Sequence, residues 1–438
     1  MQFKIYSFGC KVNQYESEYI KQLMLAEGYD YSEDDKNTDV FIVNSCSVTA
    51  VSDSKCRKLL HKLRRENTDA VILLCGCMSQ AFPRKYDNFS DCNIVIGNTT
   101  RTRIPEYISE YLKTGERIID ISDHDRKNEE FELCSVENFS ERTRAFLKIE
   151  DGCDRFCSYC IIPYARGRVR SKLIEDISTE VEKLAQNGYS EIVLVGINLS
   201  KYGTDIDKNL CDAVEVVASN ERIKRIRLGS LEPELLDNEM IKRLAECEKF
   251  CPQFHLSLQS GCDATLKRMN RHYNSAEYYD IVQNIRRNFE NPAITTDVMV
   301  GFPGENDEEF AESLNFVEKV EFSKVHVFPY SRRSGTVADK MPQQLEKSVK
   351  EKRAKKMIQA TEINRNEFLK SQIGLVCEVL FERTDKQGLF EGYSKNYTPV
   401  LVDSHGLDLS GQCIRVKITS VKNDKCIGII SDSAFENG

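Results

Sequence analysis

Three cysteines lie close together near the middle of the chain, where Cys153, Cys157 and Cys160 form the pattern Cys-x-x-x-Cys-x-x-Cys. Thiolates are soft ligands that suit iron–sulfur clusters. Three thiolates bind three irons of a cubane and leave the fourth iron open, much as a catalytic zinc keeps one position free. The same spacing also fits a structural zinc site whose fourth ligand lies elsewhere, so both kinds of metal site remain open.

A second set of cysteines is spread over the amino-terminal part of the chain. Cys10, Cys46 and Cys77 each follow the carboxyl end of a predicted strand, which is the edge where open parallel sheets bind ligands. Three thiolates from distant positions therefore converge at one sheet edge. Cys75 competes with Cys77, but Cys75 ends an apolar run whereas Cys77 follows Gly76 in the loop, so we favour Cys77. Each of these cysteines is alternatively an ordinary buried thiol.

The composition limits the classes of protein to consider. A chain of 438 residues is long enough for about two to four domains with full cores. We expect no membrane segment, because no run of eighteen apolar residues occurs. The net charge of −8 gives no general attraction to nucleic acid, so RNA contacts need a local basic patch. Seventeen cysteines without a secretory signal favour metal thiolates in a reducing cytoplasm over disulfides.

The amino-terminal region, residues 1–112, alternates predicted strands with predicted helices. The strands are short apolar runs at residues 3–8, 40–43, 70–74 and 93–96. Helical spacing of apolar residues occurs at residues 16–27, and a basic helix is expected at residues 52–65. This alternation predicts a doubly wound α/β domain. The polar and acidic residues 113–140 are typical of a linker.

Strands and helices alternate again over residues 141–330. The predicted strands are residues 145–149, 191–195, 225–228, 254–258, 294–300 and 324–328. Six strand–helix units predict a partial (β/α)6 barrel, whose chemistry should lie past the carboxyl ends of the strands. Two histidines within these strands, His255 and His326, are expected to be core residues.

The carboxy-terminal part has two sections. Residues 331–371 form a basic helical connector, whose lysines are either a solvated face or a contact for an RNA backbone. Residues 372–438 contain five short strands, at residues 375–381, 389–393, 397–402, 413–421 and 426–431. Short strands separated by turn residues predict a small antiparallel β-barrel.

The stretch from Gly152 to Gly167 (GCDRFCSYCIIPYARG) resembles the cluster loop of the radical S-adenosylmethionine (SAM) enzymes, specifically the methylthiotransferases. Residues 7–18, 44–49 and 76–80 resemble the amino-terminal domain of the same family, and residues 372–438 resemble its RNA-binding TRAM domain. After the third cysteine the family usually has a small or aromatic residue and then Ala-Gln, whereas this chain has Met78-Ser79-Gln80.

The resemblance implies two [4Fe–4S] clusters and SAM as cofactors. The ligands it implies are Cys153, Cys157 and Cys160 for the cluster that binds SAM, and Cys10, Cys46 and Cys77 for an auxiliary cluster. In and around the barrel, the residues expected to contact SAM or its cluster are Phe156, Tyr159, Gly196, Asn198, Ser230, Glu232 and Gln259. Several of these are loop residues of types that loops favour in any case.

The implied reaction converts a C–H bond into C–S–CH3, with an electron donor such as flavodoxin or ferredoxin. Residues 9–16 resemble the branch that acts on N6-threonylcarbamoyladenosine in the tRNA anticodon loop. Isopentenyladenosine tRNA and a ribosomal-protein aspartate are the alternative substrates. A non-enzymatic iron–sulfur RNA-binding regulator or electron carrier is the alternative from another class.

Four residues after the cysteine array are expected to contact the substrate. Arg166, Arg168 and Arg170 are predicted at the mouth of the active site, where guanidinium groups suit phosphate and planar carboxylates. Each arginine is alternatively part of a structural ion pair. The ring of Tyr164 is expected to stack on a base.

Overall fold

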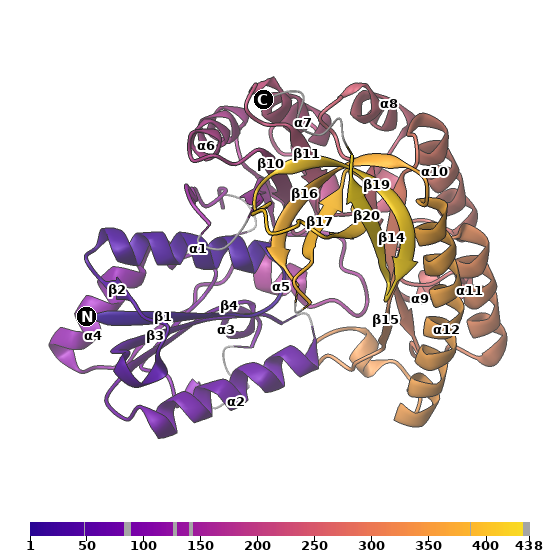
Figure 1. The fold of residues 1–438 in the computed structure, drawn as a ribbon. Helices are drawn as coiled ribbons and strands as arrows, with labels where there is room; N and C mark the ends of the chain where they lie inside the picture. The colour runs from indigo at the N-terminus through magenta and orange to yellow at the C-terminus, as the bar shows by residue number, and fades with distance from the viewer. Residues whose placement is uncertain (48, 83–88, 126–128, 140–142, 386, 432–438) are drawn as a thin grey trace.

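The computed structural model describes residues 1–47, 49–82, 89–125, 129–139, 143–385 and 387–431. An α/β domain, a barrel of parallel strands, a long helix and a small closed β-barrel follow one another along the chain (Figure 1). The predicted fold class is therefore confirmed. The expected boundary at residues 140 and 141 and the end of the last domain lie outside the described residues.

The amino-terminal domain is built on a parallel sheet of six strands in the order β2-β1-β3-β4-β5-β6. Its strands are β1 (Gln2–Ser7), β2 (Asp30–Tyr31), β3 (Val40–Ser45), β4 (Val71–Gly76), β5 (Ile94–Ile96) and β6 (Ile118–Asp120). Helices α1 (Lys11–Ala26) and α4 (Ile104–Thr114) pack on one face, and α2 (Ala50–Glu66) and α3 (Cys77–Ala81) pack on the other. This arrangement is doubly wound.

Burial explains the sequence pattern of this sheet. Every residue of β3 and β4 is buried, because helices cover both faces, and so both strands are continuous apolar runs. The sheet also includes β6, which lies beyond the predicted domain end at residue 112. The linker predicted from residue 113 therefore begins only after β6, because β6 pairs with β5 as an edge strand.

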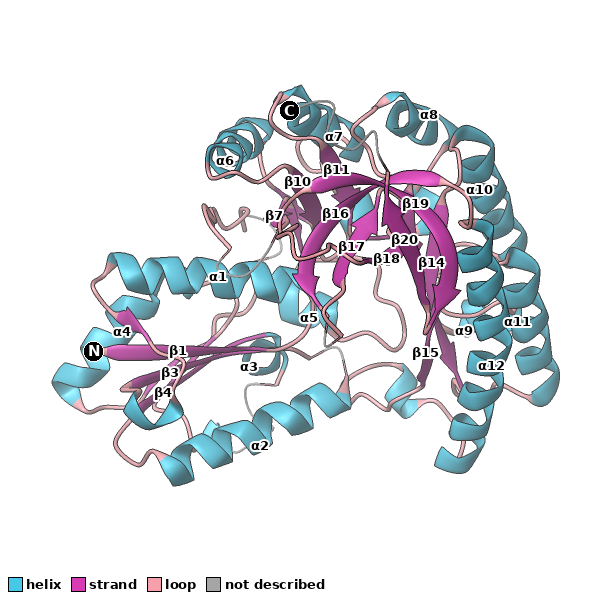
Figure 2. Ribbon diagram, viewed as in Figure 1, coloured by secondary structure: helices cyan, strands magenta, loops and turns pink. Residues whose placement is uncertain are grey.

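The central barrel has helices on its outside and parallel strands on its inside (Figure 2). Its strands form two hydrogen-bonded groups, in the orders β11-β10-β7 and β12-β13-β14-β15. The strands are β7 (Ala145–Lys148), β10 (Glu191–Val195), β11 (Arg225–Leu228), β12 (Ser230–Leu231), β13 (Gln253–Leu256), β14 (Ala293–Val300) and β15 (Lys324–Pro329). The helices are α6 (Ile174–Gln186), α7 (Leu210–Ser219), α8 (Asn238–Glu246), α9 (Asp263–Arg268), α10 (Ser275–Asn288) and α11 (Asp307–Val320).

The long helix α12 (Lys347–Ser371) runs beside β15 and α11 and leads to the last domain. Met357 and Ala354 are buried on its inner face, and buried Arg353 forms an ion pair with Glu305 at 2.7 Å. Arg353 is therefore unavailable to RNA, while Lys352 and neighbouring lysines stay exposed. Among the described residues, no helix is long and apolar enough to cross a membrane.

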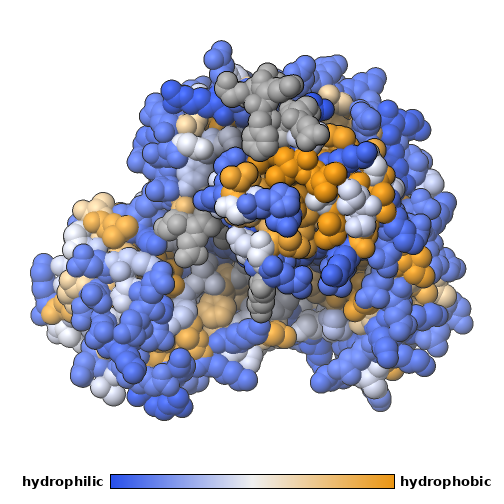
Figure 3. Space-filling view, in the orientation of Figure 1, coloured by the Kyte–Doolittle hydropathy of each residue, from blue (hydrophilic) through white to orange (hydrophobic). Residues whose placement is uncertain are grey.

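The last domain is a closed barrel in the order β16-β17-β18-β20-β19. Its strands are β16 (Val376–Thr384), β17 (Phe390–Ser394), β18 (Pro399–Val402), β19 (Cys413–Lys422) and β20 (Lys425–Ile430). The pairs are antiparallel except for β18 and β20, which are parallel and close the barrel. Apolar side chains gather on this domain in Figure 3, and Val376, Leu375 and Ile429 are exposed on it. An apolar face does not suit phosphate contacts, so we expect RNA contacts on another face.

Two arginines at the start of β11 attach the small barrel to the central barrel. Arg225 donates to the carbonyl oxygens of Tyr393 and Glu378, and Arg227 donates to those of Ser394 and Lys395, at 2.7 to 3.1 Å. Both guanidinium groups are buried, so these charged hydrogen bonds lie away from water. The small barrel therefore covers one side of the central barrel and bounds its interior.

Candidate active site

The loop that carries the Cys153 array begins directly after β8 (Glu150–Asp151), a short strand that pairs with β9 (Arg170–Ser171). Gly152 has a φ of +90°, and a Cβ atom there would lie 1.8 Å from the carbonyl oxygen of Arg168. Only glycine fits such a close approach. The Cys153 amide donates to the carbonyl oxygen of Gly167 at 2.9 Å, and the Ser158 amide donates to that of Met269 at 2.9 Å. The loop is therefore held at both ends.

The three thiols of this loop lie close enough to influence one another. Burial, and after it the neighbouring Cys157, raises the pKa of Cys160 to about 12. Burial likewise raises the pKa of Cys153 above its usual range, with added effects of Cys160 and Cys157. Buried thiols bind metal by releasing protons, so cluster binding here is coupled to deprotonation.

Asn198 and Gly196 follow β10 and lie against the cysteine loop. The side-chain amide of Asn198 donates to Cys153 Sγ at 3.6 Å, and its backbone amide donates to Glu150 Oε2 at 2.7 Å. A Cβ atom at Gly196 would lie 2.5 Å from the same carboxylate oxygen. Among the described residues, the buried Oδ1 of Asn198 and Oε1 of Glu150 have no hydrogen-bond partner. Such atoms suit a polar ligand beside the loop.

A buried arginine that the sequence did not point to connects two of the expected residues. Arg271 Nη1 donates to Cys157 Sγ at 3.3 Å, and the same guanidinium forms an ion pair with Glu232. Arg271 thus connects Glu232 to the cysteine loop. Tyr159 packs edge-on against Phe302, with ring centroids 6.4 Å apart. No motif identified Arg271, because it follows a helix and has no cysteine neighbour in the sequence.

The other expected residues occupy different surroundings. Gln259 has a φ of +67°, an unusual backbone for a non-glycine residue, and its amide donates to the carbonyl oxygen of Asp297. Ser230 is exposed and lines the barrel cavity. Phe156 and Tyr164 are exposed and form an edge-on pair with centroids 5.8 Å apart. This pair offers ring faces to a ligand, as expected of a stacking surface.

The second cysteine set lies at the carboxyl edge of the amino-terminal sheet. Cys10 is the residue before α1, Cys46 follows β3 directly, and Cys77 begins α3. A Cβ atom at Gly9 would lie 2.4 Å from Cys46 Sγ, so this thiol touches the backbone beside Cys10. Cys75 is fully buried in the sheet core, as expected for a residue that ends an apolar run.

Both cysteine sets have the donors that a [4Fe–4S] cluster needs. Each set offers three thiols at one edge of a sheet or barrel, and in each set an arginine N–H donates to one sulfur. Among the described residues, no three His, Cys, Asp or Glu side chains are gathered around a position for a single metal ion. A cubane takes one thiolate at each iron, so its ligands stand further apart than those of one ion.

Arg166 and Arg170 are not at the mouth of the site, and this prediction is wrong. Arg166 is fully buried and Arg170 is 6% exposed, and both guanidinium groups already have carboxylate partners within the protein. The reason is two buried carboxylates, Glu16 and Asp151, which need cationic partners. The alternative of a structural ion pair holds for both arginines. Arg168 is exposed and stays a predicted substrate contact.

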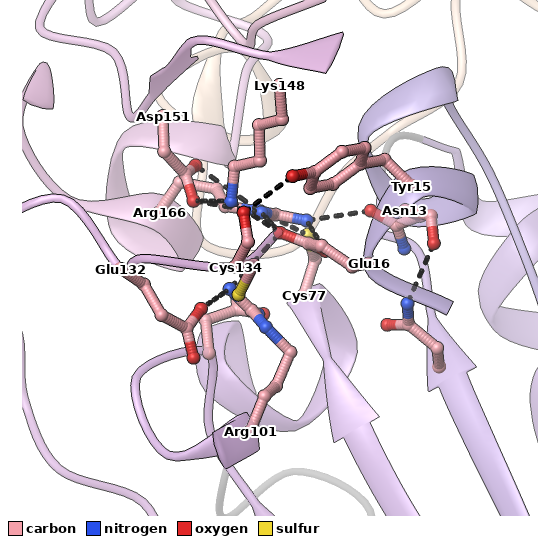
Figure 4. Close-up of polar contacts among 12 residues, drawn as sticks. Asn13, Tyr15, Glu16, Cys77, Arg101, Glu132, Cys134, Lys148, Asp151 and Arg166 are labelled. Atoms are coloured by element: carbon pink, nitrogen blue, oxygen red, sulfur yellow. Dashed lines mark hydrogen bonds and ion pairs between the residues drawn. The ribbon is translucent and has the colours of Figure 1, made fainter. Parts of the chain in front are cut away.

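Glu16 is the centre of a buried ionic network between the amino-terminal domain and the barrel (Figure 4). Its carboxylate lies 3.1 Å from Arg101 Nη2, 2.8 Å from Lys148 Nζ and 2.5 Å from Arg166 Nη1. Burial alone would raise the pKa of Glu16, but the three cations outweigh it and lower the pKa to about 2. Glu16 therefore stays ionised and ties the two domains together.

Glu16→Gln should destabilise the protein by about 3–5 kcal/mol at neutral pH, because three buried cations lose their shared carboxylate. The pKa of Glu16 is lower in the folded protein than its ordinary 4.5, so its contribution is full above pH 4.5 and is lost toward pH 2. Urea denaturation across this pH range should show that the difference in unfolding free energy between Glu16→Gln and the wild type becomes smaller as the pH falls.

The control for this prediction is Glu110→Gln, an exposed glutamate on α4 whose replacement should change the unfolding free energy by less than about 0.5 kcal/mol. A Glu16→Gln protein as stable as Glu110→Gln at neutral pH would contradict the role of the network. A difference in unfolding free energy between Glu16→Gln and the wild type that stays constant as the pH falls would contradict it as well.

A cavity of about 870 Å³ lies between the three domains. It is lined by Lys11 of α1, by barrel strands that contribute His255 and His326, and by Tyr393 and Tyr397 of the small barrel. The two histidines therefore line the cavity instead of a closed core. His255 Nδ1 lies 2.9 Å from Thr295 Oγ1. Seven Lys or Arg residues and three Asp or Glu residues line this space, which favours an anionic ligand.

Comparisons with known proteins cover most of the chain. Residues 147–317 match the Radical SAM superfamily, and residues 2–97 match the uncharacterized protein family UPF0004. Threonylcarbamoyladenosine tRNA methylthiotransferase MtaB of Bacillus subtilis is 36% identical over 94% of this chain and 92% of that protein. The chain belongs to the radical SAM tRNA methylthiotransferase family.

Other members and a solved structure extend this comparison. MtaB of Thermotoga maritima is 37% identical over 90% of this chain and 89% of its own. The tRNA-2-methylthio-N(6)-dimethylallyladenosine synthase of Clostridium botulinum is 34% identical over 98% and 96%. The radical SAM methyltransferase TsrM of Kitasatospora setae has a TM-score of 0.57 at 13% identity over 77% and 73%, which shows the fold alone. As a radical SAM methylthiotransferase, the protein uses [4Fe–4S] clusters and SAM.

Proposed function

We propose that this tRNA methylthiotransferase acts on C2 of N6-threonylcarbamoyladenosine beside the anticodon. The observation that carries the proposal is the arrangement of two three-cysteine sets on adjoining domains, with a buried ionic network between these domains and a cationic cavity lined by all three domains. An electron carrier or a regulator would have no use for a cationic cavity of this size. A tRNA substrate also assigns the enzyme to the cytoplasm, with flavodoxin or ferredoxin as the class of electron donor.

The two cysteine sets have different roles in the proposed reaction. Cys153, Cys157 and Cys160 hold the cluster that binds SAM, and the second set holds the auxiliary cluster. When bound, these groups supply a one-electron cleavage that makes an unactivated C–H bond reactive, and the sulfur that replaces the hydrogen. Asn198 orients the loop through Cys153 Sγ and offers its unpartnered Oδ1 to the polar end of SAM. The protein thus contributes position and exclusion of water.

The threonylcarbamoyl group suits the surroundings of the site because it carries a carboxylate. The cavity wall includes Lys324 and His326 from β15, along with an excess of arginines and lysines from other elements. The exposed pair Phe156 and Tyr164 offers stacking faces for a base that is turned out of the anticodon loop. We expect exposed Arg168, which follows Tyr164 by four residues, to contact the RNA backbone.

The isopentenyl-modified adenosine is the second candidate substrate. The Clostridium botulinum relative that is named for dimethylallyladenosine covers nearly the whole chain at 34% identity. An isopentenyl group is apolar, however, and carries no charge that complements the excess of Lys and Arg residues on the cavity wall. A site lined by polar and charged groups discriminates against an apolar analogue, so we favour the threonylcarbamoyl base.

The purified enzyme, loaded with iron and sulfide, should modify tRNA carrying the threonylcarbamoyl base on the order of 100-fold or more faster than tRNA carrying the isopentenyl base. The physical reason is that a site built for a polar group rejects an apolar analogue. Both tRNAs are compared at equal concentration and fixed salt, because phosphate contacts alone are salt-dependent and unselective.

Unmodified tRNA of the same sequence is the control for this comparison, and it should also react slowly. Equal rates with both modified bases would contradict the proposed substrate. Modification of a ribosomal protein only would contradict it as well.

A further inference from the structure

Arg166 ends the short helix α5 (Ile162–Arg166), which directly follows the Cys153 array, yet its side chain points away to the other domain. Its Nε–H donates to Cys77 Sγ at 3.2 Å, across 89 positions of sequence. The residue is fully buried, so no water competes for this hydrogen bond. A charged donor on a thiolate makes a strong hydrogen bond in such surroundings.

The rest of the guanidinium group is fixed from both domains. Nη2 donates to Asn13 Oδ1 at 2.7 Å and to Glu16 Oε2 at 2.9 Å, while Nη1 lies 3.2 Å from Asp151 Oδ2. Asp151 Oδ1 in turn accepts from the Gly152 amide at 2.8 Å, directly before Cys153. A continuous polar path therefore runs from Cys77 through Arg166 to Asp151 (Figure 4), and the Gly152 amide continues it to the other cysteine loop.

We propose that Arg166 is a positioning residue that holds Cys77 and sets the reduction potential of the cluster bound by Cys10, Cys46 and Cys77. Hydrogen bonds to the sulfurs of an iron–sulfur cluster stabilise its more negative, reduced state and so raise its potential. The inference rests on the cluster assignment in the proposed function. It gives Arg166 a role at the auxiliary cluster in place of the predicted substrate contact.

The Cys153 array has its own arginine in a comparable position. Arg271 Nη1 donates to Cys157 Sγ at 3.3 Å and is held by the Glu232 carboxylate, just as Arg166 is held by Glu16. The two arginines come from different elements and serve different cysteine sets. Each cluster therefore has one buried cation whose removal should affect that cluster and leave the other unchanged.

The test uses the full chain with Cys153, Cys157 and Cys160 replaced by alanine, so that only the auxiliary cluster is present. The protein is grown with arginine labelled with 15N in its guanidinium group, loaded with iron and sulfide, and reduced. Pulsed electron paramagnetic resonance should detect a 15N coupling to the cluster, because Arg166 Nε lies within hydrogen-bond distance of Cys77 Sγ. No arginine is altered in this sample, so a folding defect of an arginine variant cannot obscure the result.

Arg166→Lys in the same background should lose this coupling and show a lower midpoint potential with unchanged iron content. Arg101→Lys is the matched control, because Arg101 binds the same Glu16 carboxylate, at 3.1 Å, and among the described residues its hydrogen bonds go to Asn98 and Glu132 and not to a cysteine sulfur. Arg101→Lys should keep both the coupling and the potential. Absence of the 15N coupling from an iron-loaded protein would overturn the inference, as would equal potentials of the Arg166→Lys and Arg101→Lys proteins.

The iron content separates failure of this inference from failure of the proposed function. If the protein without Cys153, Cys157 and Cys160 binds no iron, the assignment of the auxiliary cluster is wrong and the inference is overturned along with it. If it binds one cluster's iron but shows no arginine coupling, the assignment stands and only the role of Arg166 is wrong.

Discussion

Replacing Cys153, Cys157 and Cys160 together by alanine should abolish the formation of 5′-deoxyadenosine from SAM and leave about half of the bound iron. Two of these thiols accept hydrogen bonds from residues beside the loop, Cys153 from Asn198 and Cys157 from Arg271. Without them SAM has no open iron to bind, whereas the second set lies on another domain and keeps its donors. The measurements are product analysis by mass spectrometry and iron determination on the same preparation.

The matched control for this triple variant is Cys413→Ala, which removes an exposed thiol on the small barrel. It should keep the iron content and the activity of the wild type. Loss of all iron from a folded triple variant would contradict two independent cluster sites. Normal 5′-deoxyadenosine formation in the triple variant would contradict the assignment of the SAM-binding cluster.

Replacing Cys10, Cys46 and Cys77 by alanine should abolish methylthio transfer to tRNA while SAM cleavage stays measurable. The reason is the division between the domains, since the amino-terminal set lies on its own sheet and Arg166 links Cys77 to Asp151, the second residue before Cys153. The measurement compares the yields of methylthiolated nucleoside and of 5′-deoxyadenosine in one reaction mixture.

Cys75→Ser is the matched control for this second variant, and it also tests the choice of Cys77 over Cys75. Cys75 Sγ lies 3.7 Å from the carbonyl oxygen of Val43 in the sheet core, where a serine hydroxyl can donate in its place. Cys75→Ser should therefore keep both the iron and the transfer activity. A Cys75→Ser protein that folds but lacks one cluster would contradict the choice of ligand, and absence of SAM cleavage from the triple variant would contradict the division of roles.

Local patterns were enough to predict most of the fold. Continuous apolar runs predicted β3 and β4, because strands covered on both faces have no exposed positions for polar residues. The alternation of strands and helices predicted the doubly wound domain and the barrel. The short edge strands β2 and β6 were missed, because none of their residues is buried and neither forms a continuous buried apolar run as the short strand β5 does.

The partners of the arginines could not be predicted from local patterns. Arg166 follows a cysteine array and has the residue type of a phosphate contact, but its partner Glu16 is 150 positions away in the sequence. Glu16 occupies a helix position where a carboxylate is ordinarily exposed, and only the packing of α1 against the barrel buries it. Arg271 was missed for the same reason, since its contacts with Cys157 and Glu232 are purely tertiary.

The most direct test of the proposed function is mass spectrometry of the tRNA nucleosides from cells that have or lack this gene. The 2-methylthio derivative of N6-threonylcarbamoyladenosine should be absent without the gene, while unsubstituted N6-threonylcarbamoyladenosine remains, and a plasmid copy should restore the derivative. A copy with alanine at Cys153, Cys157 and Cys160 should not restore it. The proposed function would be contradicted if the level of this derivative were unchanged without the gene. That holds whether 2-methylthio-isopentenyladenosine is lost instead or all methylthiolated nucleosides remain.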